Sequence, residues 1–270
     1  MSDAVLADLL ARYRAARERR APWEPLWRDC YAYALPRRAG PRGAAPETTY
    51  DGTAADGVEQ LAASLLAELA PPWSSWLGLE PAPGVTAVEA QTLAPMLEEA
   101  TQRLLGHFHR SNFAVELHQC FLDLACVGTA TLAFEEAPTG AATAFTFTAV
   151  PADDVFIEAG PGGQVRGHFR VNRLRGAEIL QRYEPWRLGA ERAAKLEREA
   201  DRKVELVEAV LAEAQGYGYA AFLVDGGDDA ALLDEGHFQT SPFVTFRWTK
   251  GAGDVYGRSP VMTALPDVKT

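Results

Sequence analysis

The sequence predicts an α+β fold in which an N-terminal layer of about four helices precedes mostly antiparallel strands with intervening helices. Three observations predict this class. Apolar residues recur at helical spacing up to about residue 127. After Gly128 the pattern changes to the two-residue alternation of half-buried strands. Glycine- and proline-rich turns then divide the later sequence into hairpins, with two helical segments between them.

The first helical segment, residues 3–34, is predicted to break or kink near Pro22 and Pro25, because proline removes a hydrogen bond from the helix ladder. Its apolar residues recur every three or four positions, which predicts a face in the core rather than a surface that stacks on a ligand. The positions are Leu6, Leu9, Leu10, Tyr13, Trp23, Trp27, Tyr31 and Leu35. Residues 36–50 are rich in Pro, Gly and Arg and predict an exposed loop.

Three more helices are expected before residue 128. Asp51 or Thr53 can cap the second, which runs to about Leu69 and is ended by two prolines, Pro71 and Pro72. Its apolar face consists of Val58, Leu61, Leu65 and Leu69. Residues 73–79 read as extended. The third helix covers 85–110 and the fourth covers 113–127, with Ser111 or Asn112 as the N-cap between them.

The second half of the chain is expected to form hairpins. In one strand, Phe169 and Val171 point to one face and His168 to the other. The predicted strands are 129–135, 143–151, 154–158, 165–173, 203–213, 217–224 and 241–248. Helices are predicted over 175–183 and 188–199, a tight turn over 225–229, and a last helix from about Ser259, with Pro260 in its first turn.

These elements suggest three regions: a helical part over 1–127, a mostly β part with inserted helices over 128–258, and the start of a helix over 259–270. The last helix begins so close to the final residue that it has no visible packing partner. We therefore expect the chain to be the N-terminal part of a longer protein.

The charge balance disfavours non-specific binding of duplex DNA. The net charge is −11: residues 1–50 carry nine arginines and six acids, a balance of +3, so the other 220 residues carry −14. Binding to phosphates requires many Lys and Arg contacts, so this surface is expected to repel DNA rather than hold it. Three cysteines without a close pair favour a reduced compartment. No apolar run is long enough for a membrane span.

The sequence predicts no catalytic, cofactor-binding or metal-binding residues. The histidines and cysteines between residues 107 and 126 do not have the spacing of converging zinc ligands. The glycine-rich segment 160–167 lies between strands, so a hairpin turn explains it better than a phosphate site. Residues 224–236 break the order of a calcium loop, and Ser74 and Ser75 lack a nucleophile elbow.

Four sequence blocks, which occur in the same order as in a known family, nevertheless give the chain a resemblance to that family. The blocks are RAPWEPLWRDCYAYALP (20–36), YDGTAADGVEQLAASLLAELAPPWSSWLGLE (50–80), HFHRSNFAVELHQCFLDLACVGTATLAFEE (107–136) and SPFVTFRWTKGAGDVYGRSPVMTALPDVKT (241–270). In these blocks the chain resembles the head-tail connector (portal) proteins of short-tailed, T7-like bacteriophages (podoviruses).

The resemblance implies a structural subunit of a ring, typically a dodecamer, at one vertex of the capsid. Such rings conduct double-stranded DNA, without sequence specificity, during packaging and ejection. The implied partners are further copies of the chain, capsid and scaffold proteins, the terminase large subunit and tail adaptor proteins, with no cofactor and no membrane. The implied location is the virion, and the host cytoplasm during assembly. The chain would be the wing of such a subunit, ending before the stem.

Two sets of residues follow from this reading. The expected structural core residues are Trp23, Trp27, Leu65, Trp73 and Trp76, where Trp73 and Trp76 would join the helical layer to the sheet. Arg37, Arg38 and Arg42 are candidate residues of a subunit interface, unless they belong to a solvated basic loop. Two other functions stay open: a different α+β virion adaptor or interaction module, and an enzyme with an unrecognised site, which would show a pocket with converging polar groups.

Overall fold

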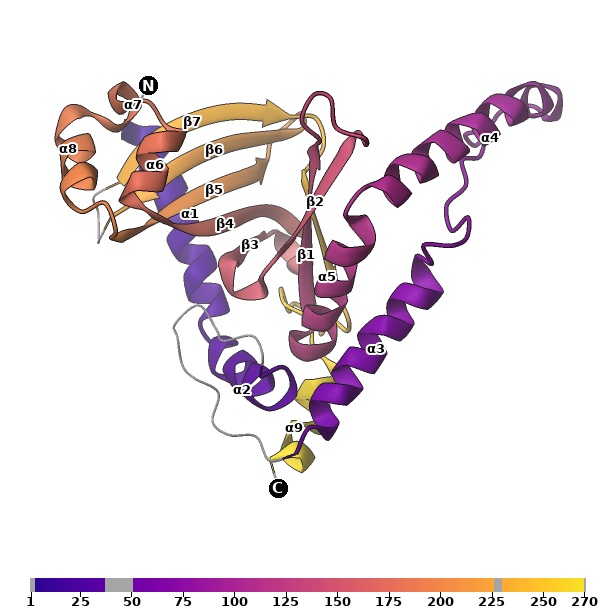
Figure 1. Cartoon of the computed structure of the whole chain (residues 1–270), viewed down its shortest axis with the longest axis horizontal. Coiled ribbons are helices and arrows are strands. Elements are labelled where there is room, and N and C mark those ends of the chain that lie inside the picture. The colour runs from indigo at the N-terminus through magenta and orange to yellow at the C-terminus, as the bar shows by residue number, and fades with distance from the viewer. Residues whose placement is uncertain (1–2, 37–50, 226–229, 270) are drawn as a thin grey trace.

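The computed structural model describes residues 3–36, 51–225 and 230–269, which form an N-terminal helical layer followed by two antiparallel sheets (Figure 1). The predicted α+β class is confirmed. The helices are α1 (Asp3–Arg20), α2 (Glu24–Ala34), α3 (Thr53–Leu69), α4 (Ala87–Arg110), α5 (Phe113–Val127), α6 (Gly176–Arg182), α7 (Pro185–Leu188), α8 (Ala190–Arg198) and α9 (Pro260–Val268). Two short 3-10 helices are η1 (Ala152–Asp154) and η2 (Pro161–Gly163).

The strands form a small sheet and a large one. The small sheet has the order β2-β1-β8, and the large sheet has the order β3-β4-β5-β6-β7, in which each strand pairs with its neighbours in the sequence. The strands are β1 (Thr129–Glu136), β2 (Phe145–Val150), β3 (Val155–Ala159), β4 (Val165–Arg175), β5 (Lys203–Ala212), β6 (Tyr217–Val224), β7 (Ala230–Phe238) and β8 (Phe243–Arg247). All pairings are antiparallel.

Helix α1 covers one face of the large sheet. Tyr13 is buried among three phenylalanines of the sheet, with ring-centroid distances of 5.5 Å to Phe156, 5.5 Å to Phe169 and 6.2 Å to Phe222. The spacing that predicted an apolar face on this helix therefore identified the packing of α1 correctly.

The opposite face of the large sheet has two covers. Helices α6–α8 pack on one part of it around Ile179 and Leu206, and the small sheet packs on the other. His168 of β4 lies between the sheets, where its Nε2 is 2.8 Å from Thr245 Oγ1 on β8. As predicted, His168 lies on the face opposite Phe169 and Val171.

Helix α5 covers the outer face of the small sheet and turns directly into its central strand at Gly128. This glycine has φ 77°, in the left-handed region that favours residues without a Cβ. A Cβ at this position would also lie 2.6 Å from the Arg258 backbone carbon, so only glycine fits this corner. The corner thus brings the segment before α9 against the junction of α5 and β1.

Two expectations from the sequence are wrong. Residues 230–238 were not predicted as a strand, yet β7 pairs with β6 along its length and forms the edge of the large sheet. The last helix does have packing partners: Val261 and Leu265 of α9 are buried in the cluster that α2 and α5 also line. The break predicted near Pro22 and Pro25 is confirmed, because α1 ends at Arg20 and α2 begins at Glu24.

Candidate functional site

The most distinctive surface of the molecule is an arm, which we define as residues 69–100. It comprises the end of α3, the connection to α4 and the first turns of α4. Figure 1 shows α4 projecting away from both sheets, with its first turns at the outermost end. Within the described residues, the arm therefore has no sheet packed against it, unlike the helices that cover the two sheets.

Large apolar side chains are exposed along the arm. Trp73 is 76% exposed, Val88 is 75% exposed and Met96 is 67% exposed. Six of the thirteen large apolar residues that the described chain exposes lie here, and they are Leu69, Trp73, Leu79, Val88, Leu93 and Met96. Single exposed apolar residues are ordinary, but a gathered set of them is typical of a surface that binds a partner.

A capping box starts α4 on this arm. Glu89 N donates to Thr86 Oγ1, and Thr86 N donates to Glu89 Oε2 over 3.0 Å. The hydrogen bond from the Thr86 hydroxyl lowers the pKa of Glu89, so the carboxylate stays charged at the positive end of the helix dipole. The capping box therefore stabilises the first turn of α4 without contacts from the rest of the described chain.

Helix α4 has two apolar faces. Its inner face carries Leu97 and Leu105, and Leu105 is buried where the helix approaches α5. Helical spacing places Val88, Met96 and Glu99 together on the opposite, outer face. An outer face with two such exposed apolar side chains is unusual for a solvated helix, and it is the face available to another molecule.

The arm and the helix before it carry a one-sided charge. Residues 51–102 contain eight acids and no Lys, Arg or His, so their formal charge is −8. Four of these acids lie within the arm, and they are Glu80, Glu89, Glu98 and Glu99. The arm therefore combines apolar contact area with negative charge, which favours a partner that is apolar and basic.

An aromatic cluster attaches the base of the arm to the small sheet. The Trp76 ring stacks on Phe113 at a centroid distance of 5.4 Å, and Phe113 in turn lies 5.0 Å from Phe147 of β2. Phe108 of α4 contacts all three rings. Leu79 N donates to Thr101 Oγ1 over 3.0 Å, which holds the connection against α4. The arm is therefore fixed at its base and unpacked towards its tip.

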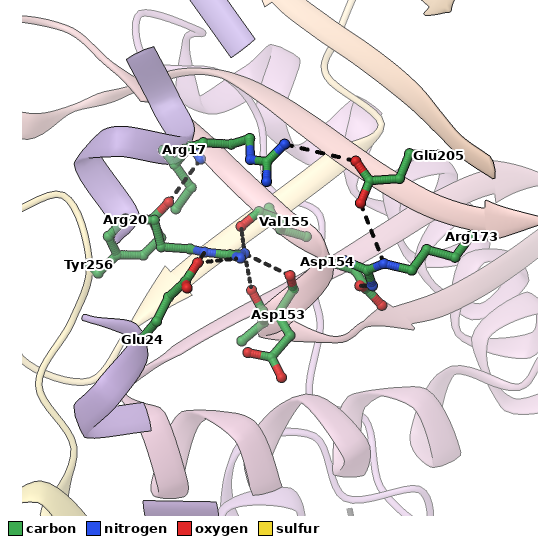
Figure 2. Close-up of polar contacts among 11 residues, drawn as sticks. Arg17, Arg20, Glu24, Asp153, Asp154, Val155, Arg173, Glu205 and Tyr256 are labelled. Atoms are coloured by element: carbon green, nitrogen blue, oxygen red, sulfur yellow. Dashed lines mark hydrogen bonds and ion pairs between the residues drawn. The ribbon is translucent and has the colours of Figure 1, made fainter. Parts of the chain in front are cut away.

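A second candidate feature is a buried arginine at the corner between α1 and α2 (Figure 2). Arg20 is 4% exposed, and its Nη1 donates to the carbonyl oxygens of Ala152, Asp153 and Val155 over 3.2, 2.7 and 3.1 Å. Its Nε and Nη2 donate to Glu24. The guanidinium carbon also lies 3.6 Å from the Phe156 ring centroid.

These contacts make Arg20 a structural joint rather than a reactive group. The three carbonyls belong to η1 and the first residue of β3, the segment that connects the two sheets. Figure 2 shows the joint continuing through Arg173, which pairs with Asp154 at 2.7 Å and with Glu205 at 3.5 Å. Burial raises the pKa of Asp153, whose carbonyl Arg20 holds. The network fixes the N-terminal helices to the large sheet and to the segment that connects the two sheets.

Beside this joint lies a hollow of about 400 Å³ whose rim is basic, and we call it the corner pocket. The residues that line it are Arg19, Trp23, Ala159, Gly160, Gly162, Gly163, Gly253, Asp254 and Val255. Arg258 stacks on Trp23 with its guanidinium carbon 5.2 Å from the ring centroid, and Lys250 Nζ donates to the carbonyl of Gly162. Arg19, Lys250 and Arg258 are exposed. Arg258 also pairs with Asp254 at 3.6 Å.

The expected core residues are found in different environments. Trp27 is 1% exposed, and Trp23, Leu65 and Trp76 are partly buried against the same core. The expectation that Trp73 joins the helical layer to the sheet is wrong, because its side chain is exposed on the arm. Two consecutive prolines turn the chain away from the core just before it. Arg37, Arg38 and Arg42 lie outside the described residues.

Sequence reasoning missed the arm as a surface. The signal was present, since residues 51–102 lack any cation and Val88 falls on the helix face opposite Leu97. Within the described residues no group of three His, Cys, Asp or Glu side chains converges as metal ligands would. No helix in the same part of the chain is both long and apolar enough to span a membrane.

A family described as "Bacteriophage head to tail connecting protein" matches residues 6–270, nearly the whole chain. The chain belongs to this family. The resemblance to head-tail connectors is therefore confirmed at the level of the family, and the four sequence blocks that indicated it all lie within the match.

The chain is also similar to the "Probable portal protein" of Bordetella phage BPP-1. The two are 25% identical over 284 aligned residues, which cover 97% of this chain and 50% of the relative. The chain thus spans about half the length of the curated relative that it matches. The arm with its exposed apolar residues and the corner pocket are the candidate contact surfaces of the described chain.

Proposed function

We propose that this connecting protein is the wing of a portal subunit, which assembles with further copies into a ring, typically a dodecamer, at one vertex of the capsid. The observation that carries the proposal is the match to the head-to-tail connecting family over residues 6–270, supported by the relative named as a probable portal protein. In this assignment residues 1–127 are the helical part of the wing and 128–258 its β part. Residues 259–270 begin the helix that leads to the stem.

The proposed ring is a channel for double-stranded DNA during packaging and ejection. The formal charge of −11 supports this role, because a surface with few available cations gives sliding DNA little to bind. The function is mechanical in this proposal, and catalysis belongs to the packaging motor. The interlocked polar groups around Arg20 support a structural role, since they satisfy one another rather than face a substrate.

The proposed partners are those of a short-tailed, T7-like phage particle: capsid and scaffold proteins, the terminase large subunit and tail adaptor proteins. The protein would be found in the host cytoplasm during assembly and at the portal vertex of the virion afterwards. The exposed apolar residues of the arm support a role that requires protein partners, because a free monomer gains nothing from exposing them.

Electron microscopy of the complete gene product tests the proposal. The purified protein is expected to form closed rings with a central channel. In virions, a specific antibody is expected to label a single vertex of each particle. A protein that remains monomeric at all concentrations, and is absent from virions, would contradict the proposal.

Reversal of charge at Arg37, Arg38 and Arg42 provides a second test. If these arginines contribute to the contact between subunits, replacement of all three by Glu weakens ring formation, which native mass spectrometry measures. Rings of unchanged abundance would show that this segment is a solvated basic loop, without affecting the proposed portal role.

A further inference from the structure

We infer that the arm of one copy packs against the corner pocket of a second copy, so that these two surfaces form a head-to-tail contact between identical subunits. The inference rests on the proposed ring and names the two surfaces that would close it. It is carried by three observations: the exposed apolar and acidic face of the arm, the basic and aromatic lining of the pocket, and the positions of the two on the molecule.

The arm supplies an apolar surface with a negative edge. Val88 and Met96 are exposed on the outer face of α4, and the same face carries Glu99. Glu98 follows on the neighbouring position and accepts a hydrogen bond from Gln102. The ion pair between Glu99 and Arg103 is exposed at both ends, so it contributes little stability within the subunit. Both carboxylates are exposed and have only surface contacts within α4, so a basic partner can replace those contacts.

The corner pocket supplies the complementary surface. Trp23 gives it an aromatic wall, and three exposed cations lie around it: Arg19, Lys250 and Arg258. The charged residues of the lining are Arg19 and Asp254, and together with the neighbouring Lys250 and Arg258 these four groups carry a charge of +2. An acidic, apolar segment matches this lining in both charge and polarity.

The two surfaces lie apart on the subunit. Figure 1 shows the first turns of α4 at one extreme of the molecule, whereas the corner between α1 and α2 lies below the large sheet, with the small sheet between it and α4. A closed ring of identical subunits requires two different surfaces of this kind, because each subunit uses one of them for the preceding copy and the other for the next.

A second copy fits the pocket better than nucleic acid does. Duplex DNA is bound by cations arranged along an extended surface, and here the cations surround a hollow that also contains the Asp254 carboxylate. A volume of about 400 Å³ accepts a few side chains rather than a helix of DNA. The arm provides side chains of the required kind, and it carries no cation between residues 69 and 100.

Two charge-reversed variants of the complete gene product test the pairing. The arm variant carries Glu98→Arg and Glu99→Arg, and the pocket variant carries Arg19→Glu and Lys250→Glu. Each variant alone would place like charges at every contact, so its midpoint of assembly is expected to move to at least tenfold higher protein concentration. In a 1:1 mixture both contacts of an alternating ring again join opposite charges, and assembly returns to near the wild-type midpoint.

Native mass spectrometry and mass photometry measure the assembly, and circular dichroism shows whether each variant is folded. Recovery in the mixture also rules out misfolding, since a misfolded chain cannot be restored by its partner variant. The matched control reverses Glu191 and Glu197 on α8, two exposed residues outside both surfaces, and is expected to assemble like the wild type.

The other outcomes overturn the pairing in distinct ways. If either variant assembles normally alone, its surface is not in the contact. If both are impaired and the mixture does not recover, the arm and the pocket do not bind each other. If the pocket variant assembles normally but loses retention of a 30-base-pair duplex, the pocket binds nucleic acid instead. If the wild type does not assemble, the proposed ring itself fails.

Discussion

The body of the molecule and its arm are built from similar residues and have opposite environments. In the body, the large sheet has α1 on one face and α6–α8 with the small sheet on the other, and Trp27 is buried. On the arm, a tryptophan of the same chemistry, Trp73, is exposed. The body therefore buries its core between these layers, whereas six of the thirteen large apolar residues exposed in the described chain gather on the arm.

This difference separates stability from assembly. Changes in the body are expected to lower the free energy of unfolding of the subunit, because buried contacts and satisfied polar groups are lost there. Changes on the arm are expected to leave the isolated subunit intact and to alter its association.

The largest contrast is expected between Trp27→Ala and Trp73→Ala. Removal of the buried Trp27 ring leaves a cavity and lowers the free energy of unfolding by about 3–5 kcal/mol. The same substitution at the exposed Trp73 changes it by less than about 0.5 kcal/mol. Urea unfolding followed by circular dichroism measures both. Equal losses would mean that Trp73 is packed in solution, and the distinction between body and arm would fail.

A somewhat smaller effect is expected at Arg20. Arg20→Met leaves three carbonyl oxygens of the joint without their donor and the Glu24 carboxylate without its partner, which costs about 2–4 kcal/mol. The matched change, Arg103→Met, removes an exposed ion pair of α4 and costs at most about 0.5 kcal/mol. If Arg20→Met unfolds at the same urea concentration as the wild type, the joint does not hold the helices to the sheets.

The body is also expected to be sensitive to acid through His168. Burial between the sheets lowers the pKa of His168 to about 4, from 6.5 in the unfolded chain. The folded state therefore binds this proton less readily than the unfolded chain does. The free energy of unfolding is at its full value above pH 6.5 and decreases as the pH falls towards 4. Between pH 7 and pH 5 this group alone removes about 2 kcal/mol.

The measurement is the free energy of unfolding of the wild type and of His168→Gln over this pH range. The difference between the two slopes isolates the histidine from the carboxylates. Gln can still donate to or accept from Thr245 but does not titrate, so its slope is expected to be shallower. Parallel slopes would show that His168 is not buried in a neutral form.

The smallest effect is expected at the beginning of α4. Thr86→Ala removes one half of the capping box, which weakens the first turns of the helix by about 1 kcal/mol. Because this end of the arm is not packed, the change is expected to be local. Amide hydrogen exchange should become about fivefold faster in the first turns of α4 and stay unchanged in β5 and β6. Faster exchange throughout the chain would mean that the arm and the body unfold together.

The sequence predicted the fold well where the pattern was local. The helices before Gly128, the hairpin of β5 and β6 and the proline-started α9 all follow from periodicity and turn residues. Strand β7 was missed because its residues AALLDEGHF are weak strand formers, and their strand conformation comes from pairing with β6. Its Asp234 and Glu235 suit an edge, where charged side chains discourage further pairing.

The arm, the Arg20 joint and the corner pocket were less predictable. They depend on contacts between residues far apart in the sequence or, for the arm, on side chains that have no packing partner in the described chain. The acceptors of Arg20 are 132 to 135 residues away, so no local pattern shows that this arginine is buried. Trp73 was expected in the core because tryptophans usually are buried, and only the path of the chain after Pro72 shows otherwise. The corner pocket joins segments around residues 19–23, 159–163 and 253–255.

The central claim is that the arm is covered only when subunits assemble. Hydrogen exchange of the first turns of α4, compared between assembled and dissociated protein, tests it most directly. On assembly we expect exchange in residues 87–100 to slow by at least tenfold, while the amides of β5 and β6 are protected equally in both states. The same rapid exchange of residues 87–100 in both states would contradict the claim, because the arm would then be exposed in the ring as well.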